Sequence, residues 1–259
     1  MAVKTLSVII PTYNEADNIE KLLGEIEQAL ENVPYEVVFV DDSTDSTPAL
    51  LERVAEIDKR VRFEHRENKS GLATAVLRGF ELAKGDYIAV MDADLQHPPI
   101  TLRYMYCAMR RGAEICIPSR FIPGGSDGGL DFYRKFVSGT ARYIGKFFLR
   151  CLWRVSDPTS GLFMLRRDIL EDADLRPVGW KILIEVLAMC RYSKVTEVPY
   201  TFCDRNAGES KLSKKVTLEY IRQVFGLIPR AKHSRANVVK WSPARLELEL
   251  RELNSRLKV

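Results

Sequence analysis

Two hydrophobic periods alternate along the N-terminal part of this chain, and this alternation restricts its fold more than any other feature. Thr5–Pro11 (TLSVIIP), Tyr35–Val40 (YEVVFV) and Tyr87–Met91 (YIAVM) are apolar runs of strand length. Between the first two runs, apolar residues recur at helical spacing at Ile19, Leu22, Leu23, Ile26 and Leu30. A second helix is expected with Thr47 as its N-cap and Pro48 in its first position. Strands that alternate with helices favour an α/β fold with a mostly parallel sheet.

Polar residues follow each of these strands, where an open parallel sheet binds its ligands. The three strand ends read PTYNE (Pro11–Glu15), DDSTD (Asp41–Asp45) and DADLQHPP (Asp92–Pro99). Carboxylates placed together repel one another unless a cation or hydrogen-bond donors neutralise them, so Asp92 and Asp94 indicate a site for Mg²⁺ or Mn²⁺. Taken alone, such a pair is also typical of helix caps and of solvated loops.

Composition limits the classes of protein that need to be considered. The chain has 259 residues, of which 46% are hydrophobic, and its formal net charge is only +4. A dedicated nucleic-acid-binding protein is therefore not expected, and nucleic acid is excluded as a partner. We predict one catalytic domain over residues 1–228 and a helical tail over residues 229–259. The last helix is expected to begin at Ser242–Pro243, with leucines at heptad-like spacing at Leu246, Leu250, Leu253 and Leu257.

Cysteine usage and hydropathy indicate where such a protein works. The five cysteines include no CxxC pair, which favours a reduced, cytosolic protein. The three histidines lie far apart in the sequence, so a zinc site is not expected. No apolar run approaches the roughly 20 residues that span a bilayer. If the protein works at a membrane, it is predicted to be peripheral.

Several separate motifs identify a resemblance to a known family. SVIIPTYNE, VDDSTD and MDADLQHPP, in this order, resemble the inverting family 2 glycosyltransferases, which have the GT-A (nucleotide-diphospho-sugar transferase) fold. Further motifs are similar to the dolichyl-phosphate mannosyltransferases in particular: Pro118–Arg120, Phe132–Lys135, Asp157–Gly161 and Gly208–Lys211. The resemblance covers roughly Leu6 to Phe225. It implies transfer of mannose from GDP-mannose to dolichyl (polyprenyl) phosphate. The expected partners are therefore a nucleotide sugar donor and a polyprenyl phosphate acceptor.

The resemblance also implies roles for individual residues. The donor would contact Pro11, Tyr13, Glu15, Asp41, Asp42, Asp92, Arg205 and Lys211. The metal, Mg²⁺ or Mn²⁺, would be bound by Asp92, Asp94 and Gln96. The acceptor phosphate would be held by Arg120, Arg134 and Ser138, since a guanidinium fork matches phosphate oxygens. Asp94, Arg120 and Arg134 would then be the catalytic residues.

The residues near Gly179 distinguish between acceptors. A sugar hydroxyl needs a general base, whereas a phosphate monoester, with a second pKa near ~6, is already an anion at neutral pH. Hydroxyl-directed relatives commonly carry a Glu-Asp or Asp-Asp pair where this chain reads GWKI (Gly179–Ile182). Glu185, one turn on, is not assigned as a base. Glucose transfer from UDP-glucose, a hydroxyl-directed transferase and a non-catalytic nucleotide-binding or membrane-recruiting subunit remain as alternatives.

Two features raise the question of membrane contact. Phe132–Trp153 predicts a helix with aromatic residues on one broad face and with Lys135, Arg142, Lys146 and Arg150 on a charged face. Such a helix can lie on the cytoplasmic side of an anionic membrane, or it can pack on the sheet with its basic side solvated. Val216–Ile228 raises the same choice. The leucine-patterned tail has three alternatives: docking on its own domain, forming a homodimer, or binding a membrane partner subunit.

Two departures from the family limit what can be carried over. The acidic loop DDSTD is one residue shorter than the DDxSxD of many relatives, so the individual contacts to the nucleobase of the donor are not carried over. Some dolichyl-phosphate mannosyltransferases also carry transmembrane helices after the catalytic domain, where this chain has only the tail from Ser242.

Overall fold

The fold is organised around one twisted sheet of mostly parallel strands. The computed structural model describes residues 4–67, 71–129, 132–203, 214–232 and 236–257. The sheet has the strand order β3-β2-β1-β4-β6-β5-β7-β8, and only β6 runs antiparallel to its neighbours. The strands are β1 (Leu6–Thr12), β2 (Tyr35–Asp41), β3 (Val61–His65), β4 (Tyr87–Val90), β5 (Ile115–Ser119), β6 (Phe163–Arg166), β7 (Lys194–Pro199) and β8 (Asn237–Lys240).

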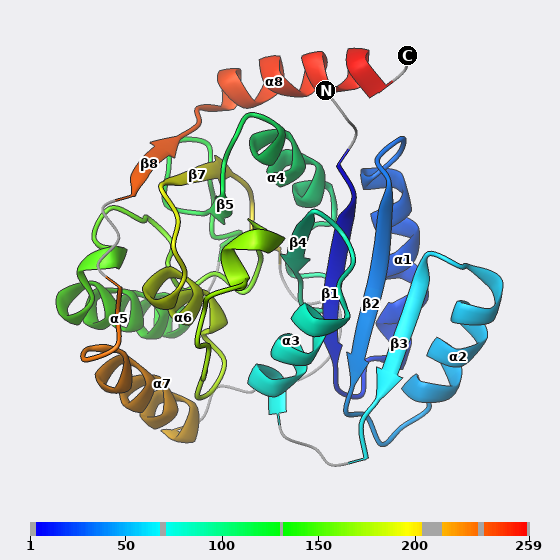
Figure 1. Cartoon of the computed structure of the whole chain (residues 1–259), viewed down its shortest axis with the longest axis horizontal. Coiled ribbons are helices and arrows are strands. Elements are labelled where there is room, and N and C mark those ends of the chain that lie inside the picture. The colour runs from blue at the N-terminus through cyan, green and yellow to red at the C-terminus, as the bar shows by residue number, and fades with distance from the viewer. Residues whose placement is uncertain (1–3, 68–70, 130–131, 204–213, 233–235, 258–259) are drawn as a thin grey trace.

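Helices cover both faces of this sheet (Figure 1). They are α1 (Ala16–Ala29), α2 (Thr47–Ile57), α3 (Gly71–Leu82), α4 (Ile100–Arg110), α5 (Phe132–Phe148), α6 (Ile182–Met189), α7 (Lys214–Leu227) and α8 (Pro243–Leu257), with short 3₁₀ helices at Arg150–Leu152 and Arg167–Leu170. One core lies between the sheet and α1, α2, α4 and α8, and the other lies under α3, α6 and α7. The α/β architecture expected from the alternating periods is confirmed.

The alternation of side chains along β1 explains why both faces need a cover. Val8 and Ile10 enter one core, whereas Ile9 enters the other, and all three side chains are fully buried. A strand of this kind is apolar along its whole length because a parallel sheet is covered on both sides. Its polar residues are therefore displaced to the strand ends, where the site is built.

The C-terminal helix packs against the rest of the chain. Leu246 and Leu253 of α8 are buried in the core that α4 also lines, and Leu250 and Leu257 pack against it. Arg111, which follows α4, forms ion pairs with Glu249 and Glu252. The leucine face of the tail is thus occupied by its own chain, as the docking alternative requires. The helix begins at Pro243, as the sequence indicates.

The predicted cap of the second helix is wrong by one residue. The N-cap of α2 is Ser46, and Thr47 is the first helical residue. The Thr47 hydroxyl instead accepts a hydrogen bond from the backbone N–H of Glu15, 3.1 Å away. The side chain that would have capped α2 therefore connects the start of α2 to the N-cap residue of α1.

Candidate active site

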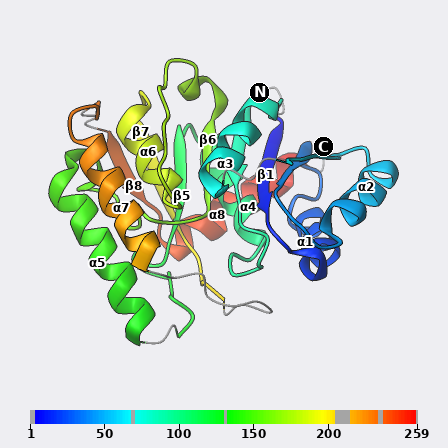
Figure 2. The same ribbon diagram turned by 90° about the horizontal axis from the view of Figure 1, so that it is seen from below.

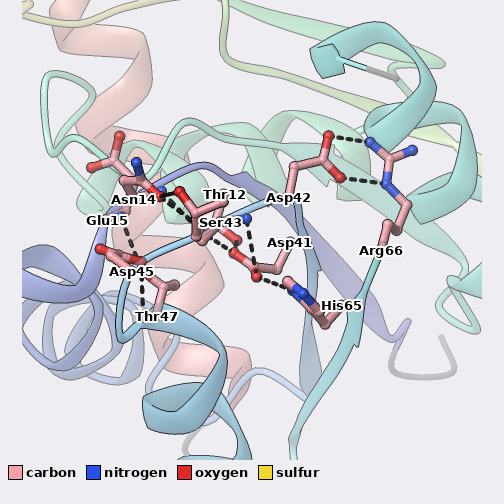
Figure 3. A network of polar contacts seen from close by, with 11 residues as sticks. Thr12, Asn14, Glu15, Asp41, Asp42, Ser43, Asp45, Thr47, His65 and Arg66 are labelled. Carbon is pink, nitrogen blue, oxygen red and sulfur yellow. Dashed lines mark hydrogen bonds and ion pairs between the residues drawn. The ribbon is translucent and has the colours of Figure 1, made fainter. Parts of the chain in front are cut away.

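The ends of β1 and β2 are joined by a network of buried polar contacts (Figure 3). Asp41, fully buried at the end of β2, accepts hydrogen bonds from the hydroxyls of Thr12, at 2.7 Å, and Ser43, at 2.5 Å. Its other oxygen lies 2.7 Å from Nδ1 of His65. A buried carboxylate with this many partners is held in one orientation. Asp41 therefore fixes the shape of the loops that follow β1 and β2, which are called the acidic rim below.

Asn14 extends the network from the β1 side. Its backbone N–H donates to Ser43 Oγ at 2.8 Å, and its side-chain oxygen accepts from the backbone N–H of Thr44 at 2.9 Å. Asn14 has φ 58°, a left-handed conformation that Asn tolerates better than most residues. Together with the bond between Glu15 and Thr47, these contacts hold the PTYNE and DDSTD loops against each other.

Asp42 is oriented by an arginine from the next strand. The Arg66 guanidinium donates to both carboxylate oxygens of Asp42, at 2.7 Å and 2.6 Å, and also to the Thr74 hydroxyl at 3.0 Å. Such a bidentate pair fixes the carboxylate plane, and each oxygen keeps a lone pair for a further donor. The pair links the rim to α3, because Thr74 belongs to that helix.

Asp92 and Asp94 follow β4 and lie in a tightly constrained loop. Asp94 is buried, and its Oδ1 accepts a hydrogen bond from the backbone N–H of Gln96 at 3.1 Å. Leu95, between Asp94 and Gln96, has φ 60°. A Cβ atom at Gly161 would lie 2.7 Å from Oδ2 of Asp92, so only glycine leaves room for this carboxylate.

These side chains fit a hard divalent cation. Among the described residues, no group of three or more His, Cys, Asp and Glu side chains is placed to hold a metal ion. The oxygen atoms of Asp92, Asp94 and Gln96 are nevertheless of the kind that Mg²⁺ and Mn²⁺ prefer, and three such ligands would leave coordination positions for phosphate oxygens and water. The buried histidine nearby adds no positive charge, since burial lowers the pKa of His97 to about 3.

A second cluster, rich in cations, lies beyond β5. Arg120 pairs with the fully buried Asp157, whose Oδ2 is 2.9 Å from its Nε. Its guanidinium also lies over the rings of Phe121 and Phe202, 5.2 Å from each centroid. Burial opposes the charge of Arg120, but the Asp157 carboxylate raises its pKa above the ordinary value. This arginine is held rigidly and stays charged.

The loop that carries Asp157 is held by a buried glutamate. Oε1 of Glu197, on β7, accepts the backbone N–H groups of Ser156, at 2.7 Å, and Asp157, at 3.2 Å. Burial raises the pKa of Glu197. The glutamate thus positions Asp157, which in turn positions Arg120.

Lys181 brings a further cation to the same region. It precedes α6, and its Nζ donates to the carbonyl oxygen of Thr159 at 2.9 Å. Burial and then the charge of Arg120 lower the pKa of Lys181, whereas Asp157 and Asp92 oppose this shift. The charges of Arg120, Asp157 and Asp92 therefore all act on Lys181.

Glu185, left unassigned from the sequence, is a structural ion-pair partner. It is buried on α6 and accepts the backbone N–H of Arg176 at 2.9 Å, and one of its oxygens lies 3.5 Å from Arg230. Its interactions point away from a catalytic base.

Some of the predicted site residues have described side chains, as Arg120 after β5 does, and others do not. Pro11, Tyr13, Glu15, Asp41 and Asp42 lie at the β1 and β2 ends, and Asp92, Asp94 and Gln96 lie after β4. Arg134 and Ser138 belong to α5, but their side chains lie outside the described part of the structure. Arg205 and Lys211 lie outside the described residues altogether. The roles of all these residues remain predictions.

Several residues that shape the site were not singled out by the sequence. Arg66 and His65 look like ordinary polar residues at the end of a strand, and Glu197 looks like one polar residue in an apolar strand. Asp157 and Gly161 were marked only as parts of a motif. Lys181 was noted only because the segment Gly179–Ile182 stands where hydroxyl-directed relatives carry a pair of acidic residues.

The chain belongs to glycosyltransferase family 2. The sequence profile described as "Glycosyl transferase family 2" matches residues 7–173, more than half of the chain. Three curated relatives are named dolichol-phosphate mannosyltransferase, of which two are described here. One, from Pyrococcus furiosus, is 44% identical over 86% of this chain. The other, from Saccharomyces cerevisiae, is 38% identical over 84% of this chain and 85% of its own length.

The chain spans 63% of the length of the Pyrococcus relative. Among solved structures, a mannosyltransferase from Pyrobaculum calidifontis in complex with GDP-mannose and Mn²⁺ has a TM-score of 0.56 and 20% identity, and the match covers 99% of this chain and 70% of that one. At this identity the likeness concerns the fold. The chain is a glycosyltransferase with the GT-A fold, as the motifs imply.

Proposed function

We propose that this chain transfers mannose from GDP-mannose to dolichyl (polyprenyl) phosphate with inversion at the anomeric carbon. The observation that carries the proposal is the pair of cations on the acceptor side, Arg120 held by Asp157, and Lys181 at the start of α6. A carboxylate base is expected at that place if the acceptor is a hydroxyl group. The names of the relatives from Pyrococcus and yeast support the same acceptor and sugar.

The reaction needs positioning rather than removal of a proton. An oxygen of the acceptor phosphate dianion attacks the anomeric carbon of mannose and forms the new C–O bond. The bond from that carbon to the donor diphosphate breaks, and GDP leaves with the electron pair. Because a phosphate monoester is already an anion at neutral pH, no base is needed to activate it. Guanidinium groups only have to hold it close to the donor. Arg120, Arg134 and Ser138 are assigned this role.

The donor is assigned to the acidic rim. Pro11, Tyr13, Glu15 and Asp42 contact the base and the ribose, and Asp41 acts through Ser43 and His65 by holding the loop. Asp92, Asp94 and Gln96 would hold a divalent cation, whose charge would stabilise the departing diphosphate. Arg205 and Lys211 are assigned to the same diphosphate.

A surface on α5 and α7 supports contact with a membrane. Among the residues that the structure describes, no helix is both long and apolar enough to cross a bilayer. The two helices lie side by side (Figure 2), and their exposed side chains include Tyr143 (65% exposed), Phe147 (79% exposed) and Phe225 (51% exposed). Aromatic side chains beside basic residues favour the interface of an anionic membrane. The chain is therefore proposed to be peripheral, on the cytoplasmic side.

The experiment that tests the proposal measures both donors. Radiolabelled GDP-mannose and, separately, UDP-glucose are incubated with dolichyl phosphate with and without Mn²⁺, and label is counted in the organic extract. Label from GDP-mannose that disappears with chelator and in Asp94→Ala is expected. Label from UDP-glucose alone would mean that the donor is UDP-glucose and that the transferred sugar is glucose. An absence of lipid-soluble product from either donor, in protein that binds nucleotide and metal, would reject the phosphate acceptor.

A further inference from the structure

Phe121 is shared by two guanidinium groups from different parts of the chain. Arg120 lies over its ring at 5.2 Å from the centroid, and Arg142, from α5, lies over it at 4.0 Å. An aromatic ring attracts each cation, but it does not remove the repulsion between them. Two guanidinium groups at one ring add positive charge to this part of the surface and therefore favour a nearby anion.

The hydrogen bonds of Arg142 are incomplete. Its Nη2 lies 3.3 Å from the hydroxyl of Tyr143. Its Nε is buried and has no hydrogen-bond partner among the described residues. A buried N–H without a partner is costly, and such a group is commonly satisfied by a ligand or by water. The sequence places Arg142 on a charged helix face, in contact with a membrane or with solvent, and its position over the Phe121 ring was not expected.

The electrostatics around Arg142 also favour an anion. Lys146, one turn further along α5, has its pKa lowered by burial and then by the charge of Arg142. The carboxylates nearby are already engaged, because Asp157 pairs with Arg120 and Glu197 accepts the backbone of its loop. A phosphate monoester would bring two negative charges to this group of cations.

The helical register connects Arg142 with the acceptor residues. Arg134, Ser138 and Arg142 occupy positions i, i+4 and i+8 of α5, which share one side of a helix. We propose that Arg142 is a further ligand of the acceptor phosphate, with its Nε–H and an Nη–H directed at that group. This proposal rests on the proposed function, since it needs a phosphate acceptor at Arg120.

The test separates the acceptor phosphate from phospholipid headgroups, which offer the same chemistry. Wild type, Arg142→Ala and Arg142→Lys are assayed with a short, water-soluble prenyl phosphate and no bilayer. We expect Arg142→Ala to raise the KM for this acceptor about tenfold, as for loss of one charge-assisted hydrogen-bonded contact. The KM for GDP-mannose stays within twofold. Arg142→Lys is expected between the two, because it keeps the charge but loses the guanidinium fork.

Arg60→Ala is the matched control, because its guanidinium lies 5.0 Å from the centroid of Tyr35 at the amino ends of the strands, away from the site. The melting temperature and GDP affinity of each variant establish that it is folded. An acceptor KM unchanged in both Arg142 variants would overturn the inference, as would a defect confined to vesicles of anionic phospholipid. If wild-type protein makes no prenyl phosphate mannose, the proposed function fails first.

Discussion

The residues assigned to the donor and those assigned to the acceptor, called here the donor half and the acceptor half, are held in different ways. At the ends of β1 and β2, carboxylates are fixed by many short hydrogen bonds among residues close to strand ends, as at Asp41. On the acceptor side, cations are held by aromatic rings and by one buried carboxylate, Asp157. The difference teaches that the donor half is preorganised by the sheet, whereas the acceptor half depends on segments distant in sequence.

The largest effect is expected in the donor half. Asp94→Ala removes a proposed metal ligand and the acceptor of the Gln96 backbone N–H, so mannose transfer should fall by about 10²–10³-fold. Initial rates and calorimetric titration with Mn²⁺ and GDP measure the loss. Asp17→Ala, on the exposed side of α1, is the control. A variant that keeps its metal affinity and rate would remove Asp94 from the metal site.

A pair of arginine variants tests whether the two halves act separately. Arg66→Gln should raise the KM for GDP-mannose about tenfold, because Asp42 loses its bidentate partner. Arg120→Gln should instead raise the KM for the prenyl phosphate, by about ten- to a hundredfold. Steady-state kinetics with each substrate varied in turn measure both effects. The division into halves would be broken if each variant raised both KM values equally.

The positions of the residues assigned to the donor can be predicted from the sequence because local rules place them at strand ends. The strand expected at Thr5–Pro11 is observed at Leu6–Thr12, and the acidic residues follow strands that pair in parallel. The carboxyl ends of parallel strands meet at one edge whatever the rest of the fold does. Knowing the strands therefore locates Asp42 and Asp92 without knowledge of any long-range contact.

The acceptor half is less predictable because tertiary contacts decide it. The periodicity of α5 places Arg142 among other basic residues, and nothing local indicates that Phe121 packs on it. Strand β6 is inserted antiparallel between β4 and β5, which brings Gly161 to Asp92 across a long stretch of chain. Motif resemblance marked Gly161, but only the packing gives it a reason.

Gly161→Ala tests a contact between the β6 segment and the metal site. The new Cβ would lie 2.7 Å from Oδ2 of Asp92, so the carboxylate must move. We expect the Mn²⁺ concentration for half-maximal activity to rise about tenfold. This is the lower end of the loss of metal affinity that follows when a residue that positions a metal ligand is changed. Activity titrated against Mn²⁺ measures it. Gly24→Ala, with open space around its Cβ on α1, is the matched control. Equal metal dependence in both variants would show that Asp92 tolerates the shift.

The smallest effect on transfer is expected at Glu197, where stability rather than rate carries the signal. Burial raises the pKa of Glu197, and the N–H groups of Ser156 and Asp157 only partly oppose this. A carboxyl group whose pKa is higher in the folded state contributes stability that is complete below its unfolded pKa, about 4.5, and is lost as pH rises through the folded value. Glu197→Gln keeps an oxygen for both N–H groups and removes the titration.

The wild type should therefore gain melting temperature relative to Glu197→Gln as pH is lowered from 8 toward 5, by about 2–4 °C for each kcal/mol. Scanning calorimetry of both proteins across this range measures the difference, and Glu20→Gln, exposed on α1, controls for the loss of a surface carboxyl group. A difference that stays constant with pH would mean that Glu197 is not held in its charged form at a cost. In that case the position of Asp157, and through it Arg120, would not depend on a buried anion that is held at a cost in stability.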